Sequence, residues 1–225
     1  MARHEYQAAL EELRTDVAAL GDDVLAQLDR SLHALEHDET AAANGVIEGD
    51  AEINDRYLEL EAACIDLIAL QQPVASDLRF VVASFKILTD IERIGDLATN
   101  LAGYAIGTDG EAIADVTLFE IGAAAHDLVE DALAAYETGD ADACHRIAER
   151  DDEIDSRCHR ASERVVRDLI EQEAGAVDPW EVEAAIDDVS SVLLTIRDLE
   201  RVADHGVNIA ARTLYLTEND PALLY

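Results

Sequence analysis

The chain has 225 residues, enough for one large domain or two small ones of about 100 residues each. Apolar residues make up 49% of it, which excludes a disordered chain, and only 4% are aromatic, which is typical of an all-helical protein with an aliphatic core. The formal net charge is −34, so no basic surface is expected for binding nucleic acid.

In the first half of the chain, hydrophobic periodicity predicts three helices, over residues 3–36, 40–70 and 76–103. Asp38 or Thr40 is expected to be the N-cap of the second helix. Pro73 breaks the pattern, and Ser76 is expected to be the N-cap of the third helix.

In the second half, the same pattern predicts three more helices, over residues 117–139, 140–174 and 178–217. Thr117 with Glu120 three residues later resembles a capping box at the start of the fourth helix. Gly139 is expected to close that helix, Asp140 to cap the fifth and Asp178 to cap the sixth.

An internal repeat relates the two halves. The segment DIERIGDLATN, which begins at Asp90, returns as DLERVADHGVN, which begins at Asp198. Five polar positions match at identical spacing: Asp90/Asp198, Glu92/Glu200, Arg93/Arg201, Asp96/Asp204 and Asn100/Asn208. The residues between them differ, which indicates an old duplication.

The repeat predicts an all-α fold of two tandem antiparallel three-helix bundles. Residues 1–107 are expected to form the first repeat and residues 115–218 the second, followed by a tail at 219–225. Helices of about 30 residues reach roughly 45 Å, so the molecule should be elongated. A single continuous six-helix domain is an alternative that the sequence leaves open.

The acidity also bears on the cellular compartment. It favours a folded protein in a salt-saturated cytoplasm, because about 1 M salt screens repulsion within about 3 Å. The three cysteines form no CxxC pair and are expected to be buried thiols in a reducing compartment. We expect no signal peptide, because the opening segment is typical of an amphipathic helix with charges throughout, and no apolar run approaches the roughly 20 residues that span a bilayer. We therefore expect a cytoplasmic protein that reaches a membrane only through its partners.

An aspartate interrupts the apolar track of the second helix, at Asp50, and of the fifth helix, at Asp151. The surrounding segments IEGDAEIN and AERDDEID align without gaps and pair Asn54 with Asp155. The same inward-leaning position is therefore acidic in both repeats. Because burying a lone carboxylate is costly, each aspartate must be paired, bind a metal or lie at a bundle edge.

The third and sixth helices carry a second acidic feature. In the third helix an apolar face continues into Glu92 and Asp96, and in the sixth helix it continues into Glu200 and Asp204. Each repeat thus offers two short rows of carboxylates that could face each other across its bundle. We call the pair of rows in one repeat an acidic seam.

Hard oxygen ligands on facing helices suit a divalent or trivalent metal such as iron, zinc, manganese or magnesium. The predicted ligands are Asp50, Asn54, Glu92, Asp96, Asp151, Asp155, Glu200 and Asp204. An alternative is that Glu92 and Glu200 form ion pairs with Arg93 and Arg201 or with other arginines. The arginines could also orient the ligating carboxylates.

Catalysis has little support in the sequence. No glutamate has a histidine three residues later, which argues against a redox di-iron centre. His126, His145 and His159 are scattered and expected to be structural or exposed, and His205 is replaced by Leu97 in the first repeat. A carboxylate-bridged metalloenzyme and a structural helical adaptor both stay open as functions. We expect the protein not to be an enzyme.

The repeated ERIGD and ERVAD segments, VIEGDAEIN, and QQPVASDLR from Gln71 together resemble the PhoU family of phosphate-signalling proteins. The resemblance implies two three-helix repeats whose E(D)xxxD motifs hold metal clusters. Here these motifs fall on Glu92/Asp96, Asp151/Asp155 and Glu200/Asp204. Asn54 replaces a carboxylate in the first repeat, so metal binding is expected to be weaker there.

The same resemblance implies a regulator that restrains phosphate uptake when phosphate is plentiful. Its expected partners are the phosphate ABC transporter, through the ATP-binding subunit, and a sensor kinase or transcriptional regulator. A homodimer is also expected. The QQPVASDLR segment has no counterpart before the sixth helix, so the two repeats should not offer the same binding surfaces.

Overall fold

The structure is a computed structural model that describes residues 3–71, 73, 75–107, 116–173 and 179–224. Every regular element in these ranges is an α-helix, and there are six: α1 (Arg3–His37), α2 (Thr40–Gln71), α3 (Ala75–Gly107), α4 (Val116–Thr138), α5 (Ala141–Glu173) and α6 (Pro179–Glu218). The predicted all-α class is confirmed.

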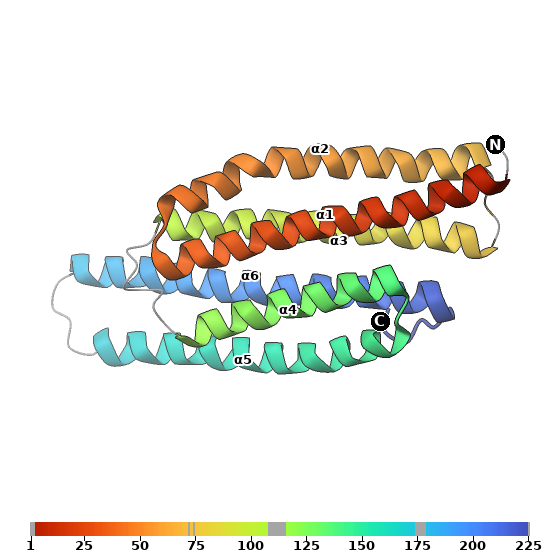
Figure 1. The fold of residues 1–225 in the computed structure, drawn as a ribbon. Coiled ribbons are helices and arrows are strands. Elements are labelled where there is room, and N and C mark those ends of the chain that lie inside the picture. The colour runs from red at the N-terminus through yellow and green to blue at the C-terminus, as the bar shows by residue number, and fades with distance from the viewer. Residues whose placement is uncertain (1–2, 72, 74, 108–115, 174–178, 225) are drawn as a thin grey trace.

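The helices pack as two sets of three that lie side by side along their length (Figure 1). Helices α1, α2 and α3 contact one another, as do α4, α5 and α6. The two sets meet through α3 against α6 and through α1 against α4. The buried apolar residues form one cluster that includes side chains of all six helices, so the core is continuous between the bundles. The predicted pair of three-helix bundles is therefore confirmed, with a shared core.

Two glycines bring α1 and α4 close together. A Cβ atom at Gly21 of α1 would lie 2.6 Å from Leu133 Cδ2, and one at Gly122 of α4 would lie 2.8 Å from Leu32 Cδ2. Each glycine thus faces a leucine of the other bundle. Any larger residue at either position would push the helices apart or displace the facing leucine side chain.

The caps between α4 and α5 match the sequence prediction. Gly139 has φ +72° and ends α4, and its N–H donates to the carbonyl of Ala135 at 2.8 Å. The Asp140 carboxylate then accepts a hydrogen bond from the Ala143 N–H at 3.0 Å and caps α5. Asp178, the expected cap of α6, lies outside the described residues.

One other predicted cap is wrong. Helix α3 begins at Ala75, so Ser76 is already helical, and its hydroxyl donates to Asp77 at 3.4 Å instead of capping the backbone. Thr117 is the second described residue of α4, and its capping box stays a prediction. The third helix also continues one turn beyond its predicted end. Tyr104 in that turn packs against the core, and such packing overrides the weak helix propensity of Gly103.

Two side-chain hydrogen bonds join the bundles across the α3–α6 contact. His205 Nδ1 lies 2.9 Å from Asp90 Oδ1, and the Tyr104 hydroxyl donates to Asp198 Oδ2 at 2.9 Å. Asp198 is fully buried and also accepts from Arg197 at 2.8 Å. The repeated aspartates Asp90 and Asp198 therefore each accept from the opposite repeat. Their recurrence is visible in the sequence, but this role depends on the contact between the two bundles.

Removal of the Tyr104 hydroxyl is expected to weaken the contact between the bundles. Tyr104→Phe deletes one donor to a buried carboxylate, a loss of about 1–3 kcal/mol. For a chain of this length, 1 kcal/mol lowers the melting temperature by about 2–4 °C. Tyr57→Phe is the matched control, because its hydroxyl donates to Glu61, which stays partly exposed to water. Equal melting temperatures for the two variants would contradict this role of Tyr104.

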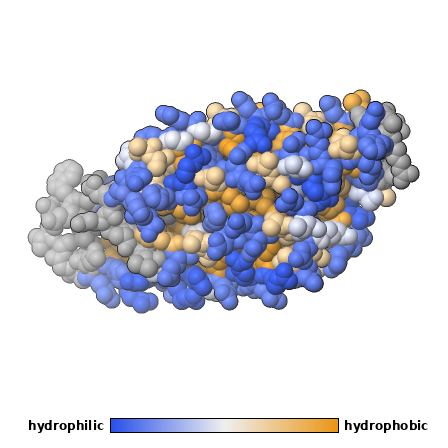
Figure 2. All heavy atoms as spheres, viewed as in Figure 1, coloured by the Kyte–Doolittle hydropathy of each residue, from blue (hydrophilic) through white to orange (hydrophobic). Residues whose placement is uncertain are grey.

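Hydrophilic residues cover most of the face seen in Figure 2, and hydrophobic residues show in a discontinuous band along its middle. This fits the excess of 50 acidic over 16 basic side chains. Within the described ranges, no helix combines the length and the apolar character that crossing a membrane requires.

Candidate metal centre

The acidic seam of the second repeat brings carboxylates of α5 and α6 together. One oxygen from each of Asp151, Asp155 and Asp204 lies within 4.8 Å of the others. Asp151 and Asp155 are one turn apart on α5, and Asp204 reaches them from α6. Glu200, one turn before Asp204, flanks this group closely enough to interact electrostatically with Asp155 and Asp204. The four predicted ligands of this repeat thus lie in one region.

The electrostatics of this seam favour a cation. Burial, followed by the negative charges of Asp155 and Asp204, raises the pKa of Asp151 to about 7. Burial and neighbouring carboxylates also raise the pKa values of Asp155 and Glu200. In addition, the Asp151 Oδ1 atom is buried and accepts no hydrogen bond in the described structure. A bound cation would satisfy this acceptor and relieve the repulsion.

The donors also fit a hard metal ion. Three carboxylates within a few ångströms, with a fourth nearby, suit Mg²⁺, Mn²⁺, Zn²⁺ or iron. Cys158 lies beside them, and burial raises the pKa of its thiol to about 12. Among the described residues, its sulfur does not belong to the group of close ligand atoms. The residues that would hold a metal here are therefore Asp151, Asp155 and Asp204, with Glu200 at the edge.

The raised pKa of Asp151 predicts that the metal-free protein becomes less stable as pH rises. Its ordinary pKa is 3.8, and in the fold it is about 7. The folded protein therefore binds the Asp151 proton more tightly than the unfolded chain does. The resulting stabilisation is complete below pH 3.8 and is lost as the pH rises through 7. One pKa unit corresponds to about 1.4 kcal/mol, and solvent screening of this partly exposed group reduces the expected loss to roughly 1–2 kcal/mol.

Melting temperatures of chelator-treated protein between pH 5 and pH 8 measure this loss. Asp151→Asn should flatten the decline, because the amide does not titrate. Asp50→Asn, at the equivalent position of the first repeat, should leave it unchanged. A decline that is as steep in Asp151→Asn as in the parent protein would show that other groups cause it.

The acidic seam of the first repeat is arranged differently. Asp50 Oδ2 accepts a hydrogen bond from the Asn54 amide at 2.9 Å, and Asp50 Oδ1 accepts one from the Thr99 hydroxyl at 3.1 Å. Both oxygens of this aspartate thus have donors from the protein itself. In the second repeat the counterpart of Asn54 is Asp155, which has no N–H to donate.

Arginine neutralises the other half of the first seam. Arg93 lies 3.6 Å from Glu92 and 3.5 Å from Asp96. Burial, followed by the charge of Asp96, raises the pKa of Glu92, and Arg93 opposes this rise. Among the described residues, these carboxylates do not form a group of three ligand oxygens within 4.8 Å. The ion-pair alternative therefore describes the first seam.

The equivalent arginine of the second repeat behaves differently. Arg201 lies 3.7 Å from Asp198 Oδ1, and no ion pair to Glu200 within 4.0 Å is found in the described structure. The duplicated Glu-Arg pair has thus diverged. In the described structure, Arg93 pairs with Glu92 and Asp96 of the first seam, whereas Arg201 turns to Asp198 and leaves the second seam.

Several other predicted features lie apart from the seams. Asn100 and Asn208 are exposed, so neither extends a buried site. His126, Asp127 and Glu130 form a second group of close ligand atoms, but all three come from α4 and two of them are exposed. The three cysteines are buried free thiols, as expected.

Together, the fold and the seams define a class of protein. It is an all-α protein of two tandem three-helix repeats, each with acidic positions on the facing sides of its second and third helices. The model of the PhoU domain family matches residues 17–105 and 118–213, one match in each repeat. The chain belongs to the PhoU family.

Relatives are similar over nearly the whole chain. A phosphate-specific transport system accessory protein PhoU homolog of Pseudomonas putida is 34% identical over 215 residues, 94% of this chain and 80% of the relative. The accessory protein PhoU of Escherichia coli is 30% identical over 213 residues, 94% of this chain and 84% of that protein.

Solved structures agree with this assignment. The phosphate transport system regulatory protein PhoU of Streptococcus pneumoniae superposes with a TM-score of 0.86 at 28% identity, covering 96% of this chain and 99% of that one. PhoU of Pseudomonas aeruginosa gives 0.81 at 30% identity, covering 96% of this chain and all of that one.

Proposed function

We propose that this chain is a metal-binding cytoplasmic regulator of phosphate uptake and phosphate-responsive signalling. The observation that carries the proposal is similarity over 94% of the chain to proteins named as accessory proteins of the phosphate-specific transport system. A similar solved structure is named as a regulatory protein of phosphate transport. An accessory role of this kind requires binding to the transporter, and we assign the ATP-binding subunit of the phosphate ABC transporter as the direct partner.

The second acidic seam supports the metal-binding part of the proposal. Asp151, Asp155 and Asp204 supply hard oxygen ligands, and the buried Asp151 Oδ1 lacks a donor. When bound, a metal would neutralise the seam and fix α5 against α6. Because α5 lies on the outer side of its bundle, away from α1–α3 (Figure 1), its position bears on the surface offered to a partner.

In this proposal the protein acts by binding other proteins and does not catalyse a reaction. The relatives are named as accessory or regulatory proteins. A sensor kinase or transcriptional regulator is the proposed second partner, and the protein is proposed to form a homodimer. These assignments rest on the family and on the sequence.

A binding measurement with purified components tests the proposal. The ATP-binding subunit of the organism's phosphate transporter is immobilised, and this protein is passed over it with Mn²⁺ or with a chelator. We expect saturable binding that the chelator weakens. The ATP-binding subunit of an unrelated ABC transporter controls for nonspecific charge effects. Absence of binding to the phosphate subunit, or equal binding to both subunits, would contradict the assigned partner.

A further inference from the structure

A pocket with no acidic lining residue lies where α3 begins and α6 ends, at the same end of the molecule (Figure 1). Its volume is about 430 Å³. Three cationic side chains line it, namely Arg79 and Lys86 of α3 and Arg212 of α6. Apolar and aromatic residues, including Leu78, Val82 and Tyr215, form the rest of its wall.

The concentration of cations is unusual for this chain. It has 16 basic against 50 acidic side chains, and Lys86 is its single lysine. Elsewhere, arginines such as Arg56 and Arg150 form ion pairs with aspartates of neighbouring helices. In the described structure, no carboxylate lies within 4.0 Å of the charged nitrogens of Arg79, Lys86 or Arg212. The pocket therefore keeps its positive charge available to a ligand.

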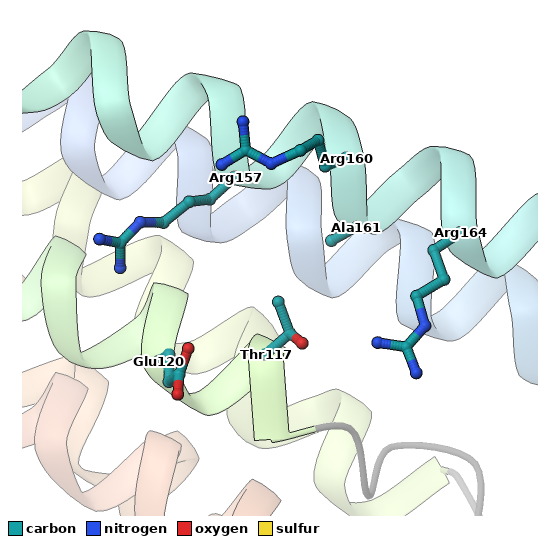
Figure 3. A pocket seen from close by; sticks show the side chains of 6 residues that line it. All are labelled: Thr117, Glu120, Arg157, Arg160, Ala161 and Arg164. Atoms are coloured by element: carbon teal, nitrogen blue, oxygen red, sulfur yellow. The ribbon is translucent and has the colours of Figure 1, made fainter.

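A second arginine-lined pocket shows the contrast. It lies between the start of α4 and α5 and is lined by Arg157, Arg160 and Arg164 of α5 and by Thr117 and Glu120 of α4 (Figure 3). Arg157 and Arg164 reach from α5 toward α4, while Glu120 contributes a carboxylate to the same space (Figure 3). Arg164 also pairs with Asp168 at 3.7 Å. Acidic side chains of the protein thus already neutralise part of that pocket.

Two guanidinium groups are held at or beside the wall of the α3–α6 pocket. The Arg212 Nε atom is buried and has no hydrogen-bond acceptor in the described structure. A buried N–H without an acceptor is rare, because it loses its hydration without compensation. Arg79 lies over the Tyr215 ring, 5.6 Å from its centroid, which holds a second guanidinium at the wall. An anion with several acceptor oxygens would pair with the charge of these guanidinium groups.

We infer that this pocket binds the phosphoryl group of a phosphorylated small molecule. The phosphoryl oxygens would contact Arg212, Arg79 and Lys86, and an organic body such as a nucleoside would lie against Leu78, Val82 and Tyr215. The volume falls within the range of small-molecule sites, and the apolar side chains beside the cations offer contact area to an organic body. The inference goes beyond the proposed transporter contact and does not depend on it.

The second repeat lacks these cations at the equivalent positions of its third helix. The duplicated segments are offset by 108 residues, from Asp90 to Asp198. At this offset Arg79 corresponds to Asp187, and Lys86 corresponds to Leu194. The second repeat has therefore lost or never had these cations. Arg79 belongs to the QQPVASDLR segment, which sets the first repeat apart in the sequence.

Calorimetric titration of the whole protein with three probes tests the inference. The probes are ADP, inorganic phosphate and adenosine, titrated after chelator treatment, in KCl at which the protein is folded. We expect ADP to bind saturably and adenosine not to bind. Weaker binding of inorganic phosphate than of ADP would identify an organic phosphate as the ligand, and equal binding would identify the free ion. Failure of both ADP and phosphate to bind would overturn the inference.

Variants locate the binding. Lys86→Gln and Arg212→Gln should each weaken ADP or phosphate binding by about tenfold or more, the loss expected for one charge-assisted contact. Arg30→Gln is the control with the same change of charge. Arg30 is exposed on α1 and donates only to the Ala26 carbonyl in the described structure. Lys86 is exposed, so its variant should fold even if Arg212→Gln does not. Equal affinities for Lys86→Gln and Arg30→Gln would overturn the inference.

Discussion

In low salt the protein is expected to lose its tertiary packing, and in multimolar KCl it is expected to be folded. The chain carries a net charge of −34, so its surface repels itself over most of its length. The screening length is about 10 Å at 0.1 M salt and about 3 Å at 1 M. Repulsion between neighbouring acidic residues is therefore screened only at high salt, and stability should rise steeply with its concentration.

Thermal melting followed by circular dichroism over a KCl series measures this dependence. Sucrose at matched osmolality is the control, because it strengthens apolar burial without screening charge. We expect KCl, and not sucrose, to restore the folded state. A melting temperature that is the same in low salt and in multimolar KCl would contradict adaptation to a salt-saturated cytoplasm.

Loss of one carboxylate is expected to remove metal from the second acidic seam. Asp204→Asn deletes one of the three close ligands while preserving side-chain shape. With Asp151 and Asp155 left as the close ligands, affinity should fall by about tenfold or more, since a carboxylate is the charged ligand type that hard cations require. Metal analysis after dialysis, together with titration of Mn²⁺, measures the change.

The first repeat supplies the matched control for this experiment. Asp96→Asn changes the equivalent residue, which in the structure lies 3.5 Å from Arg93. It should leave the bound metal nearly unchanged. Asp204→Asn should also stabilise the metal-free protein, because it removes a charge that raises the pKa of Asp151. Equal metal loss in both variants would contradict a preference for the second seam, and no loss in either would contradict the ligand assignment.

Most of the fold could be predicted from the sequence, because helical periodicity and the repeat act over long segments. The leucine and valine stripe of the first helix, for example Val17, Leu20 and Leu28, is buried as its spacing indicates. Helix ends were less predictable. Ser76 has the chemistry of a cap but lies inside α3, because a local preference for capping is weaker than tertiary packing.

The positions of the two acidic seams could be predicted from the sequence, but the hydrogen bonds and ion pairs of their carboxylates could not. The repeat indicated both seams. In the first seam, however, Asn54 donates a hydrogen bond to Asp50 and Arg93 pairs with Glu92. Such contacts depend on the directions of the side chains, which the sequence does not give. The cross-bundle pair of His205 and Asp90 was missed because only one repeat has the histidine. The α3–α6 pocket was missed because Lys86 and Arg212 lie far apart in the chain and meet only in the fold.

Phosphate uptake in a deletion strain tests the central claim most directly. Cells lacking the gene are grown in phosphate-rich medium, and import of labelled phosphate is compared with that of the parent strain and of a strain with the gene restored. We predict high uptake in the deletion strain and normal repression once the gene is restored. Uptake that stays repressed in the deletion strain, when no second gene of the family is present, would contradict a role in restraining phosphate import.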